Sequence, residues 1–243
     1  MNPHLGLTRN VLRRNYALLT RDGYVPSALP GWTKCVPYVL ISAELGAGLV
    51  QTLIECESGG RGRIETGADE WFCFVIEGRG TLNKRALRAG SFAYAPPGSS
   101  LDFVSSAKGT RLLIFQKNYE PLDGVEPLAF HVGHEKDAVE TPFLGNPQTR
   151  LKTLLADTPA NDLAVNIFSF DPGATLPFVE THIMEHGMLF LAGAGVYRLD
   201  ADWHPVQAGD ALWIAPYCPQ WFIAAGPGPA RYIYYKNVNR LPQ

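Results

Sequence analysis

The stretch ETHIMEHG, residues 180–187, contains the candidate metal-binding residues of this chain, and its interpretation depends on whether it forms a helix or extended chain. It gathers Glu180, His182, Glu185 and His186. On a helix, residues 182–186 would form the H-x-x-E-H pattern of a zinc peptidase, with both histidines on one metal and the glutamate near its water. On extended chain, Glu180, His182 and His186 become the candidate metal ligands instead.

The flanking residues favour extended chain. The preceding DPGATLPF (171–178) contains two prolines and a glycine, and MLFLAGAGVYRL (188–199) is typical of strands. Glu180, His182 and His186 share parity and therefore face one side of a strand. A straight strand would place Glu180 and His186 roughly 20 Å apart. One metal cannot be reached across that distance, so we expect the chain to turn back at residues 183–185.

An internal repeat predicts the fold. Residues 89–118 align without gaps with residues 208–237, and residues 65–82 match 180–199 at a Glu-Thr start and a Gly-x-Gly end. Short apolar runs alternate with turn signals such as EGRG (77–80) and AGAG (192–195). The prediction is an all-β protein of two tandem antiparallel barrels or jelly rolls, at residues 1–125 and 126–243.

Two segments are less regular. Residues 120–147 are rich in proline, glycine and charge, which predicts a linker between the halves. The stretch TRLKTLLAD (149–157) fits either a helix or a strand.

Composition narrows the class of protein. The 243 residues carry 21 Lys and Arg against 23 Asp and Glu, a balance that gives no basic footprint for nucleic acid or an anionic membrane. The longest apolar stretch, residues 38–54, is too interrupted to span a bilayer, and no signal peptide is evident. The four cysteines form no C-x-x-C pair, so we expect reduced, buried thiols in a soluble cytosolic protein.

The spacing of the candidate ligands resembles the two motifs of the cupin family, G-x5-H-x-H-x3-4-E-x6-G and G-x5-P-x-G-x2-H. Gly193 follows His186 at the distance that the first motif requires after its third ligand. Gln220, counted from Gly209, occupies the place of the last histidine. The resemblance implies a metal site made of Glu180, His182, His186 and Gln220. One carboxylate, one amide and two imidazoles favour Mn²⁺, with Fe²⁺, Ni²⁺ or Zn²⁺ as alternatives.

The first half serves as an internal control. Its equivalent positions hold Glu65, Gly67, Trp71 and Leu101, of which only Glu65 can bind a metal. We therefore expect a first barrel without a metal site and a second barrel that carries the active site.

A closer resemblance covers nearly the whole chain. The stretches at residues 15–32, 169–187, 195–210 and 219–237 are similar to the bicupin family of (S)-ureidoglycine aminohydrolases. The resemblance implies Mn²⁺-dependent release of ammonia from (S)-ureidoglycine to give (S)-ureidoglycolate, a step of allantoin breakdown. It also implies substrate contacts from Tyr197, Tyr232 and Lys236, beside Glu180 and Gln220. Lys236 and Glu180 are the candidate catalytic residues, with Glu180 relaying a proton to the departing amine.

Alternatives remain open at this point. Lys236 aligns with Lys117 of the metal-free half, so both lysines could lie on the surface, and Tyr197 and Tyr232 could be core aromatics. The same barrel could also serve another metal-dependent cupin enzyme, an oxygenase or isomerase acting on a small polar substrate, or a non-enzymatic binding protein. The expected partners are a small-molecule substrate and further copies of the chain in a homo-oligomer.

Overall fold

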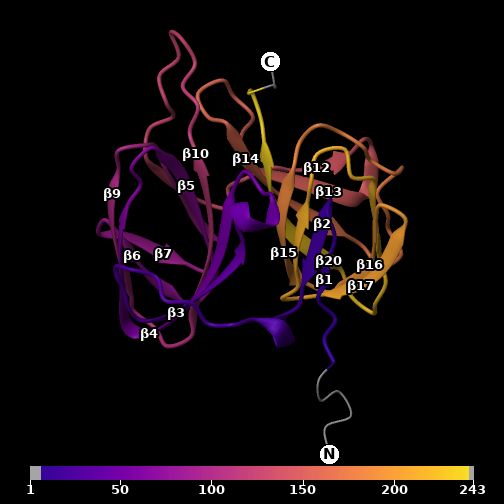
Figure 1. Cartoon of the computed structure of the whole chain (residues 1–243), viewed down its shortest axis with the longest axis horizontal. Helices are drawn as coiled ribbons and strands as arrows, with labels where there is room; N and C mark the ends of the chain where they lie inside the picture. Colours follow the sequence, from indigo (N-terminus) through magenta and orange to yellow (C-terminus); the bar gives the residue numbers. More distant parts are fainter. Residues whose placement is uncertain (1–6, 241–243) are drawn as a thin grey trace, which may run out of the picture. The chain divides into compact units, whose positions relative to one another are not determined.

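The computed structural model describes residues 7–240, and it is built almost wholly of strands (Figure 1). Within this range there are twenty strands and two 3₁₀ turns, η1 (Arg21–Gly23) and η2 (Ala43–Leu45). The all-β prediction is confirmed, and residues 149–155 of the ambiguous stretch lie in strand β13 (Asn146–Leu155) rather than in a helix. None of the helices among the described residues is long and apolar enough to cross a membrane.

The chain folds as two compact units that are not contiguous in sequence. The C-terminal unit contains residues 7–25, Glu140–Lys152 and Asn166–Lys236, and the N-terminal unit contains Pro26–Val139, Thr153–Val165 and residues 237–240. The repeat had predicted simple halves at 1–125 and 126–243. The division differs because β2 (Tyr16–Leu19) pairs with β18 (Ala211–Ile214) of the C-terminal unit, where Leu19 lies opposite Ala211.

The C-terminal unit consists of two antiparallel sheets. The larger has the order β1 (Val11–Leu12), β2 (Tyr16–Leu19), β18 (Ala211–Ile214), β15 (His186–Ala192), β20 (Ala230–Asn237), β14 (Leu163–Phe170), β13 (Asn146–Leu155) and β12 (Glu140–Phe143). The smaller has the order β17 (Asp202–Gln207), β16 (Ala194–Leu199) and β19 (Gln220–Ala224).

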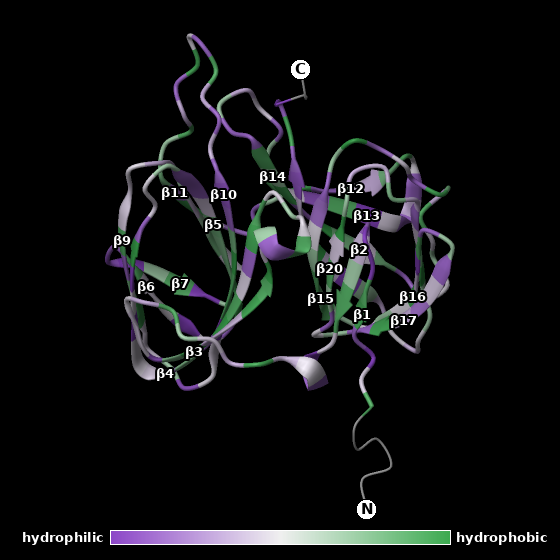
Figure 2. Ribbon diagram, viewed as in Figure 1, coloured by the Kyte–Doolittle hydropathy of each residue, from purple (hydrophilic) through white to green (hydrophobic). Residues whose placement is uncertain are grey.

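The core of this unit lies between the two sheets. Phe168 and Phe190 come from the larger sheet, and Tyr197 and Phe222 come from the smaller. Their rings meet across the gap, with 5.5 Å between the centroids of Phe190 and Phe222. Each fully buried large side chain of this kind contributes about 1.5–3 kcal/mol. Strand β14, buried at all of its residues, is mostly green in Figure 2.

The N-terminal unit contains one nine-stranded antiparallel sheet. Its order is β11 (His131–His134), β8 (Ser91–Ala95), β5 (Asp69–Glu77), β10 (Thr110–Asn118), β4 (Val50–Glu65), β9 (Ser100–Ser105), β6 (Arg79–Leu82) and β7 (Arg85–Arg88), with β3 (Trp32–Ile41) paired to β4.

Two cysteines of the N-terminal unit are joined in a disulfide. Cys35 on β3 lies directly opposite Cys56 on β4, with the two Cα atoms 4.1 Å apart. The prediction of four reduced thiols is therefore wrong for this pair, because strand pairing brings together two cysteines that sequence spacing alone does not connect. Cys73 and Cys218 are free and buried, as expected.

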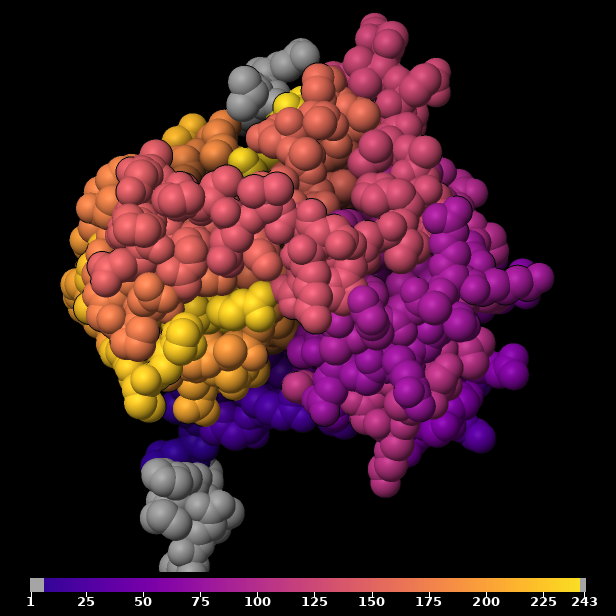
Figure 3. Space-filling model, turned by 180° about the vertical axis from the view of Figure 1, so that it is seen from behind, coloured from indigo at the N-terminus to yellow at the C-terminus, as the bar shows by residue number. Residues whose placement is uncertain are grey.

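The predicted linker, residues 120–147, contributes two strands. β11 pairs with β8, and Gly133 lies opposite Phe92, where any side chain on Gly133 would clash with the phenyl ring. β12 forms the edge of the larger sheet of the C-terminal unit. Residues 140–152, coloured salmon, lie on the surface of that unit in Figure 3. The linker prediction is thus wrong for the residues in these two strands.

A buried acidic pair lies in the N-terminal unit. Glu70 and Asp162 are fully buried. Glu70 accepts from the hydroxyl of Tyr94 at 2.8 Å and from the backbone N–H of Asp162 at 3.1 Å. The Asp162 carboxylate accepts from Lys117 at 2.8 Å and from the backbone N–H of Glu120 at 2.9 Å. Burial, followed by the hydrogen bond to the Asp162 carboxyl, raises the pKa of Glu70.

This raised pKa makes stability depend on pH. A group with a raised folded-state pKa binds a proton more tightly in the folded chain than in the unfolded chain. Its stabilising contribution is complete below the ordinary pKa of 4.5 and is lost as pH rises toward the folded value. We expect the free energy of unfolding to fall with pH in this window, by up to about 1.4 kcal/mol per pH unit for one proton. Urea unfolding at a series of pH values measures the slope.

The matched variant for this prediction is Glu70→Gln, which keeps a neutral hydrogen-bonding side chain and cannot titrate. Its stability should fall less steeply with pH over the same range. Parallel profiles for the two proteins would show that Glu70 is not the group that takes up the proton.

Candidate active site

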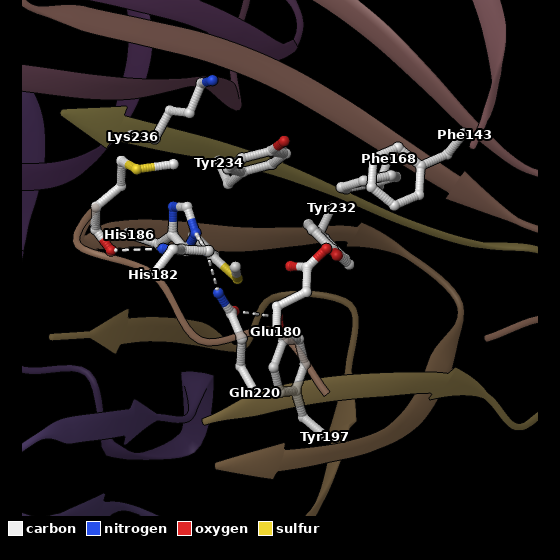
Figure 4. A pocket seen from close by; sticks show the side chains of 12 residues that line it. Phe143, Phe168, Glu180, His182, His186, Tyr197, Gln220, Tyr232, Tyr234 and Lys236 are labelled. Carbon is white, nitrogen blue, oxygen red and sulfur yellow. Dashed lines mark hydrogen bonds between the residues drawn. The ribbon is translucent and has the colours of Figure 1, made fainter. Parts of the chain in front are cut away.

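A pocket of about 150 Å³ in the C-terminal unit contains every residue that the sequence predicted for the site (Figure 4). The predicted members that line it are Glu180, His182, His186, Tyr197, Gln220, Tyr232 and Lys236. Five further lining residues were not predicted from the sequence, namely Phe143, Phe168, Met184, Met188 and Tyr234. Tyr234 has the same parity as Tyr232 and Lys236, which could have revealed it. Phe143 lies in the predicted linker, so no signal pointed to it.

The backbone follows the predicted turn. Glu180 forms an isolated bridge with Gln220, with each N–H donating to the other's carbonyl at 2.8 and 2.9 Å. The chain then runs through residues 181–185 without helix or strand, and β15 begins at His186. Gly193, the last residue of the first cupin motif, must be a glycine because a side chain there would clash with the carbonyl oxygen of Pro229. The helical peptidase alternative is therefore wrong.

The two histidines turn their Nε2 atoms toward each other. Nδ1 of His182 lies 3.1 Å from the carbonyl oxygen of Met184, and Nδ1 of His186 lies 3.0 Å from the carbonyl oxygen of Tyr235. A carbonyl oxygen only accepts, so each Nδ1 carries the proton when the ring is neutral. Both Nε2 lone pairs then face each other across 3.2 Å. Two acceptors at this distance repel each other unless a proton or a cation lies between them.

Gln220 lies beside the two imidazoles as the third candidate metal ligand. Its side-chain amide nitrogen lies 2.9 Å from Nε2 of His182, and its amide oxygen accepts from the hydroxyl of Tyr197 at 3.0 Å. Nitrogen and oxygen exchange places when the amide turns by half a rotation. The oxygen would then face the imidazoles, and the amide NH₂ would donate to the Tyr197 hydroxyl.

Glu180 lies apart from the two imidazoles. Its carboxylate extends toward Tyr232 in Figure 4. Nowhere in residues 7–240 do three His, Cys, Asp or Glu side chains converge closely enough to hold a metal ion. The structure thus brings together His182, His186 and Gln220, and it leaves the Glu180 carboxylate in the same pocket, where it would have to rotate to join them.

Burial sets the protonation states in the pocket. It lowers the pKa of His182, and it lowers the pKa of His186 to about 3, so both imidazoles are neutral at neutral pH. Burial also raises the pKa of the Glu180 carboxyl. It raises the pKa values of Tyr197 and Tyr232 well above their ordinary range, so both hydroxyls keep their protons. Neutral imidazoles, a buried carboxyl and an amide oxygen are suitable ligands for a divalent ion.

Lys236 is the cross-strand neighbour of His186. The two residues lie opposite each other in the pairing of β15 with β20, and both line the pocket. The Lys236 side chain extends away from the two imidazoles in Figure 4. Its positive charge contributes to lowering the pKa of both histidines. This part of the pocket is therefore suited to an anionic group of a ligand.

The gapless alignment of Lys236 with Lys117 is wrong by one residue. The turn between β19 and β20 spans residues 225–229, whereas the corresponding turn between β9 and β10 spans only residues 106–109. Trp71 pairs with Gln116 at the position where His186 pairs with Lys236. Gln116 is therefore the counterpart of Lys236, and Lys117 faces the other side of its strand, where it binds Asp162.

The N-terminal unit contains a counterpart pocket in which Glu65 is the only carboxylate among the lining residues. This pocket, of about 240 Å³, is lined by Trp71 in the place of His186 and by Gln116 in the place of Lys236. Glu65 directs its carboxylate to Arg63 at 3.4 Å and to the hydroxyl of Ser100 at 2.8 Å, and its side chain is largely exposed.

We therefore expect Glu65→Gln to leave the metal content of the protein unchanged, since neither Gly67, Trp71 nor Leu101 offers a second ligand. Elemental analysis of the purified variant beside the unmodified protein measures this. A loss of bound metal from a folded Glu65 variant would mean that the N-terminal unit contributes a ligand.

Comparison with known proteins identifies the class of fold to which this chain belongs. A family model for the cupin domain matches residues 166–235, which contain all seven predicted site residues except Lys236. Oxalate decarboxylase of Bacillus subtilis shares the fold, with a TM-score of 0.70 over 93% of this chain and 78% of that one at 11% identity. The protein is thus a bicupin.

Sequence relatives define the family more closely. (S)-ureidoglycine aminohydrolase of Arabidopsis thaliana is 37% identical over 98% of this chain and 80% of its own length. The enzyme of the same name from Escherichia coli K12 is 34% identical over 93% of this chain and 89% of its own length. The chain belongs to the (S)-ureidoglycine aminohydrolase family.

Solved structures agree with this assignment. The crystal structure of the E. coli protein YlbA superposes with a TM-score of 0.87 at 31% identity, covering 100% of this chain and 99% of that one. A putative glyoxylate-induced protein of Pseudomonas aeruginosa gives a TM-score of 0.88, also at 31% identity, over 100% of this chain and 95% of that one.

Proposed function

We propose that this protein hydrolyses (S)-ureidoglycine to (S)-ureidoglycolate and ammonia with the help of a divalent metal ion, Mn²⁺ before other ions. Family membership supports the reaction. The observation that carries the metal is the pair of Nε2 atoms 3.2 Å apart, since both imidazoles donate from Nδ1 and neither Nε2 bears a proton.

His182, His186, the amide oxygen of Gln220 and the rotated carboxylate of Glu180 would hold the ion. The carboxyl and amide oxygens mixed with imidazole favour Mn²⁺ among the common divalent ions. When bound, such an ion polarises a substrate oxygen and lowers the pKa of a bound water. Burial raises the pKa of Glu180 because it disfavours the charged carboxylate. A cation bound beside the carboxylate would offset this unfavourable free energy of burying a charge.

The remaining pocket residues match the groups of the substrate. Ureidoglycine carries a carboxylate, a ureido group and an amine on one carbon. The Lys236 ammonium is suited to the carboxylate or to the ureido oxygen. The protonated hydroxyls of Tyr197 and Tyr232 can donate to further oxygens and hold the reacting carbon in one orientation. Glu180 would relay a proton to the departing amine.

The test is an ammonia assay with freshly prepared (S)-ureidoglycine. Protein depleted of metal and then supplied with Mn²⁺ should release ammonia faster than a blank without protein, and it should form the (S) enantiomer of ureidoglycolate. Ammonia release equal to the blank would contradict the proposal. Oxygen uptake, or rearrangement of the substrate without ammonia, would favour the oxygenase or isomerase alternative.

A further inference from the structure

Glu185 is a buried acidic residue that the proposed reaction does not use. It directly precedes His186 in the chain, and only 5% of its surface is exposed. One carboxylate oxygen accepts from the indole N–H of Trp213 at 3.2 Å, and the other accepts from the hydroxyl of Tyr235 at 3.5 Å. Leaving such donors buried without a partner costs about 1–3 kcal/mol each, so this arrangement needs the acceptor.

The register of the sheet explains how the carboxylate reaches both donors. Trp213 on β18 and Tyr235 on β20 pair with the same residue of β15, Gly187, from opposite sides. Glu185 and Gly187 share parity and face away from the pocket into which His186 points. Because Gly187 has no side chain, the Glu185 carboxylate has room between the indole and the phenol.

Tyr235 connects Glu185 to the imidazole of His186. Its hydroxyl donates to Glu185, and its backbone carbonyl accepts the Nδ1 proton of His186 at 3.0 Å. The hydrogen bond to that carbonyl is what leaves Nε2 unprotonated and directed into the pocket. A partner that orients a metal-binding histidine through Nδ1 typically changes metal affinity by 10- to 100-fold when it is lost.

We propose that Glu185 is a positioning residue for the metal centre. It ties β15 to β18 and β20 at the point where His186 begins the strand, and it holds the Tyr235 carbonyl within hydrogen-bond distance of Nδ1 of His186. The proposal rests on the metal site of the proposed function. Of the two glutamates in ETHIMEHG, Glu180 lines the pocket, and Glu185 would act from outside the pocket.

The first arm of the test needs no metal. In the metal-free protein, ¹⁵N NMR of the histidine side chains should show His186 as the Nδ1–H tautomer. Glu185→Gln retains an acceptor oxygen and should keep this tautomer. Glu185→Leu removes both acceptors and should give a mixture of tautomers at His186, whereas the tautomer of His204, in the same unit, should stay unchanged.

The second arm measures affinity for Co²⁺ by its visible absorption. Glu185→Leu should bind Co²⁺ about 10- to 100-fold more weakly, and Glu185→Gln within a few-fold of the unmodified protein. Arg9→Met is the stability control, because it removes the ion pair with buried Asp210 in the same unit without touching the pocket. It should lower the unfolding midpoint and leave Co²⁺ affinity unchanged.

The outcomes separate the two proposals. Absence of Co²⁺ binding in the unmodified protein would overturn the metal site, while the tautomer still tests the positioning role. An unchanged tautomer and affinity in Glu185→Leu would overturn the role of Glu185. If that variant does not fold, the double variant Trp213→Phe, Tyr235→Phe removes both donors and keeps the Tyr235 carbonyl. It should show the same mixed tautomer and weaker binding, and unmodified values for both would overturn the inference.

Discussion

Replacing His186 with alanine should abolish metal binding and, with it, ammonia release. His186 supplies one of the two Nε2 atoms that meet at 3.2 Å, and its loss leaves His182 without a facing partner. The effect should exceed the roughly 10- to 100-fold loss that follows removal of an outer partner of a metal-binding histidine. Elemental analysis should find close to one divalent ion per chain before the change and none after it.

His204→Ala provides the control for this substitution. His204 belongs to the same unit, lies outside the pocket and contacts the hydroxyl of Tyr16 at 3.1 Å. This variant should retain both its metal and its activity. Two ions per chain in the unmodified protein, or an unchanged content in the His186 or His182 alanine variants, would contradict a single metal site.

The second large effect is expected at Lys236. Lys236→Met keeps most of the length of the side chain and removes the charge opposite His186, so the fold and the metal content should persist. Loss of one charge-assisted hydrogen bond to the substrate is worth about 1.5–3 kcal/mol, which corresponds to a fall of about 10- to 150-fold in kcat/KM. Steady-state ammonia release with Mn²⁺ present measures this fall.

The control for Lys236 must occupy the same register in the other unit. That residue is Gln116, which pairs with Trp71 and lines the counterpart pocket of the N-terminal unit. Gln116→Met should leave kcat/KM unchanged. Lys117 cannot serve, because it binds the buried carboxylate of Asp162. Full activity in Lys236→Met would remove this lysine from substrate binding, and an equal loss in Gln116→Met would indicate a structural role at the end of both strands.

Much of this site could be predicted from local sequence. The shared parity of Glu180, His182 and His186 and the limited reach of a strand required a turn at residues 183–185, and the structure bends at Ile183 before β15 begins at His186. The seven predicted residues all line one pocket. The orientation of the Glu180 carboxylate was not predictable, since parity specifies a face of the strand and not a side-chain rotamer.

Other features lie beyond sequence periodicity. Nothing near Tyr16–Leu19 indicates that this strand pairs with Ala211–Ile214, because pairing between distant strands leaves no local pattern. The disulfide between Cys35 and Cys56 depends on the register of β3 against β4 for the same reason. The incorrect alignment of Lys117 with Lys236 shows a further limit of the repeat. One extra residue in a turn moves every following side chain to the other face of its strand.

The pairing of β2 with β18 also determines when the C-terminal unit can form during synthesis. Arg9 and its partner Asp210 are 201 positions apart. At a translation rate of about 5–20 residues per second, β2 would wait roughly 10 to 40 s for β18 to leave the ribosome. During that time a strand whose Tyr16, Ala17 and Leu18 are destined for burial presents an open edge. The nascent chain is therefore most exposed to aggregation before its last strands emerge, and a chaperone that shields this segment would raise the yield of folded enzyme.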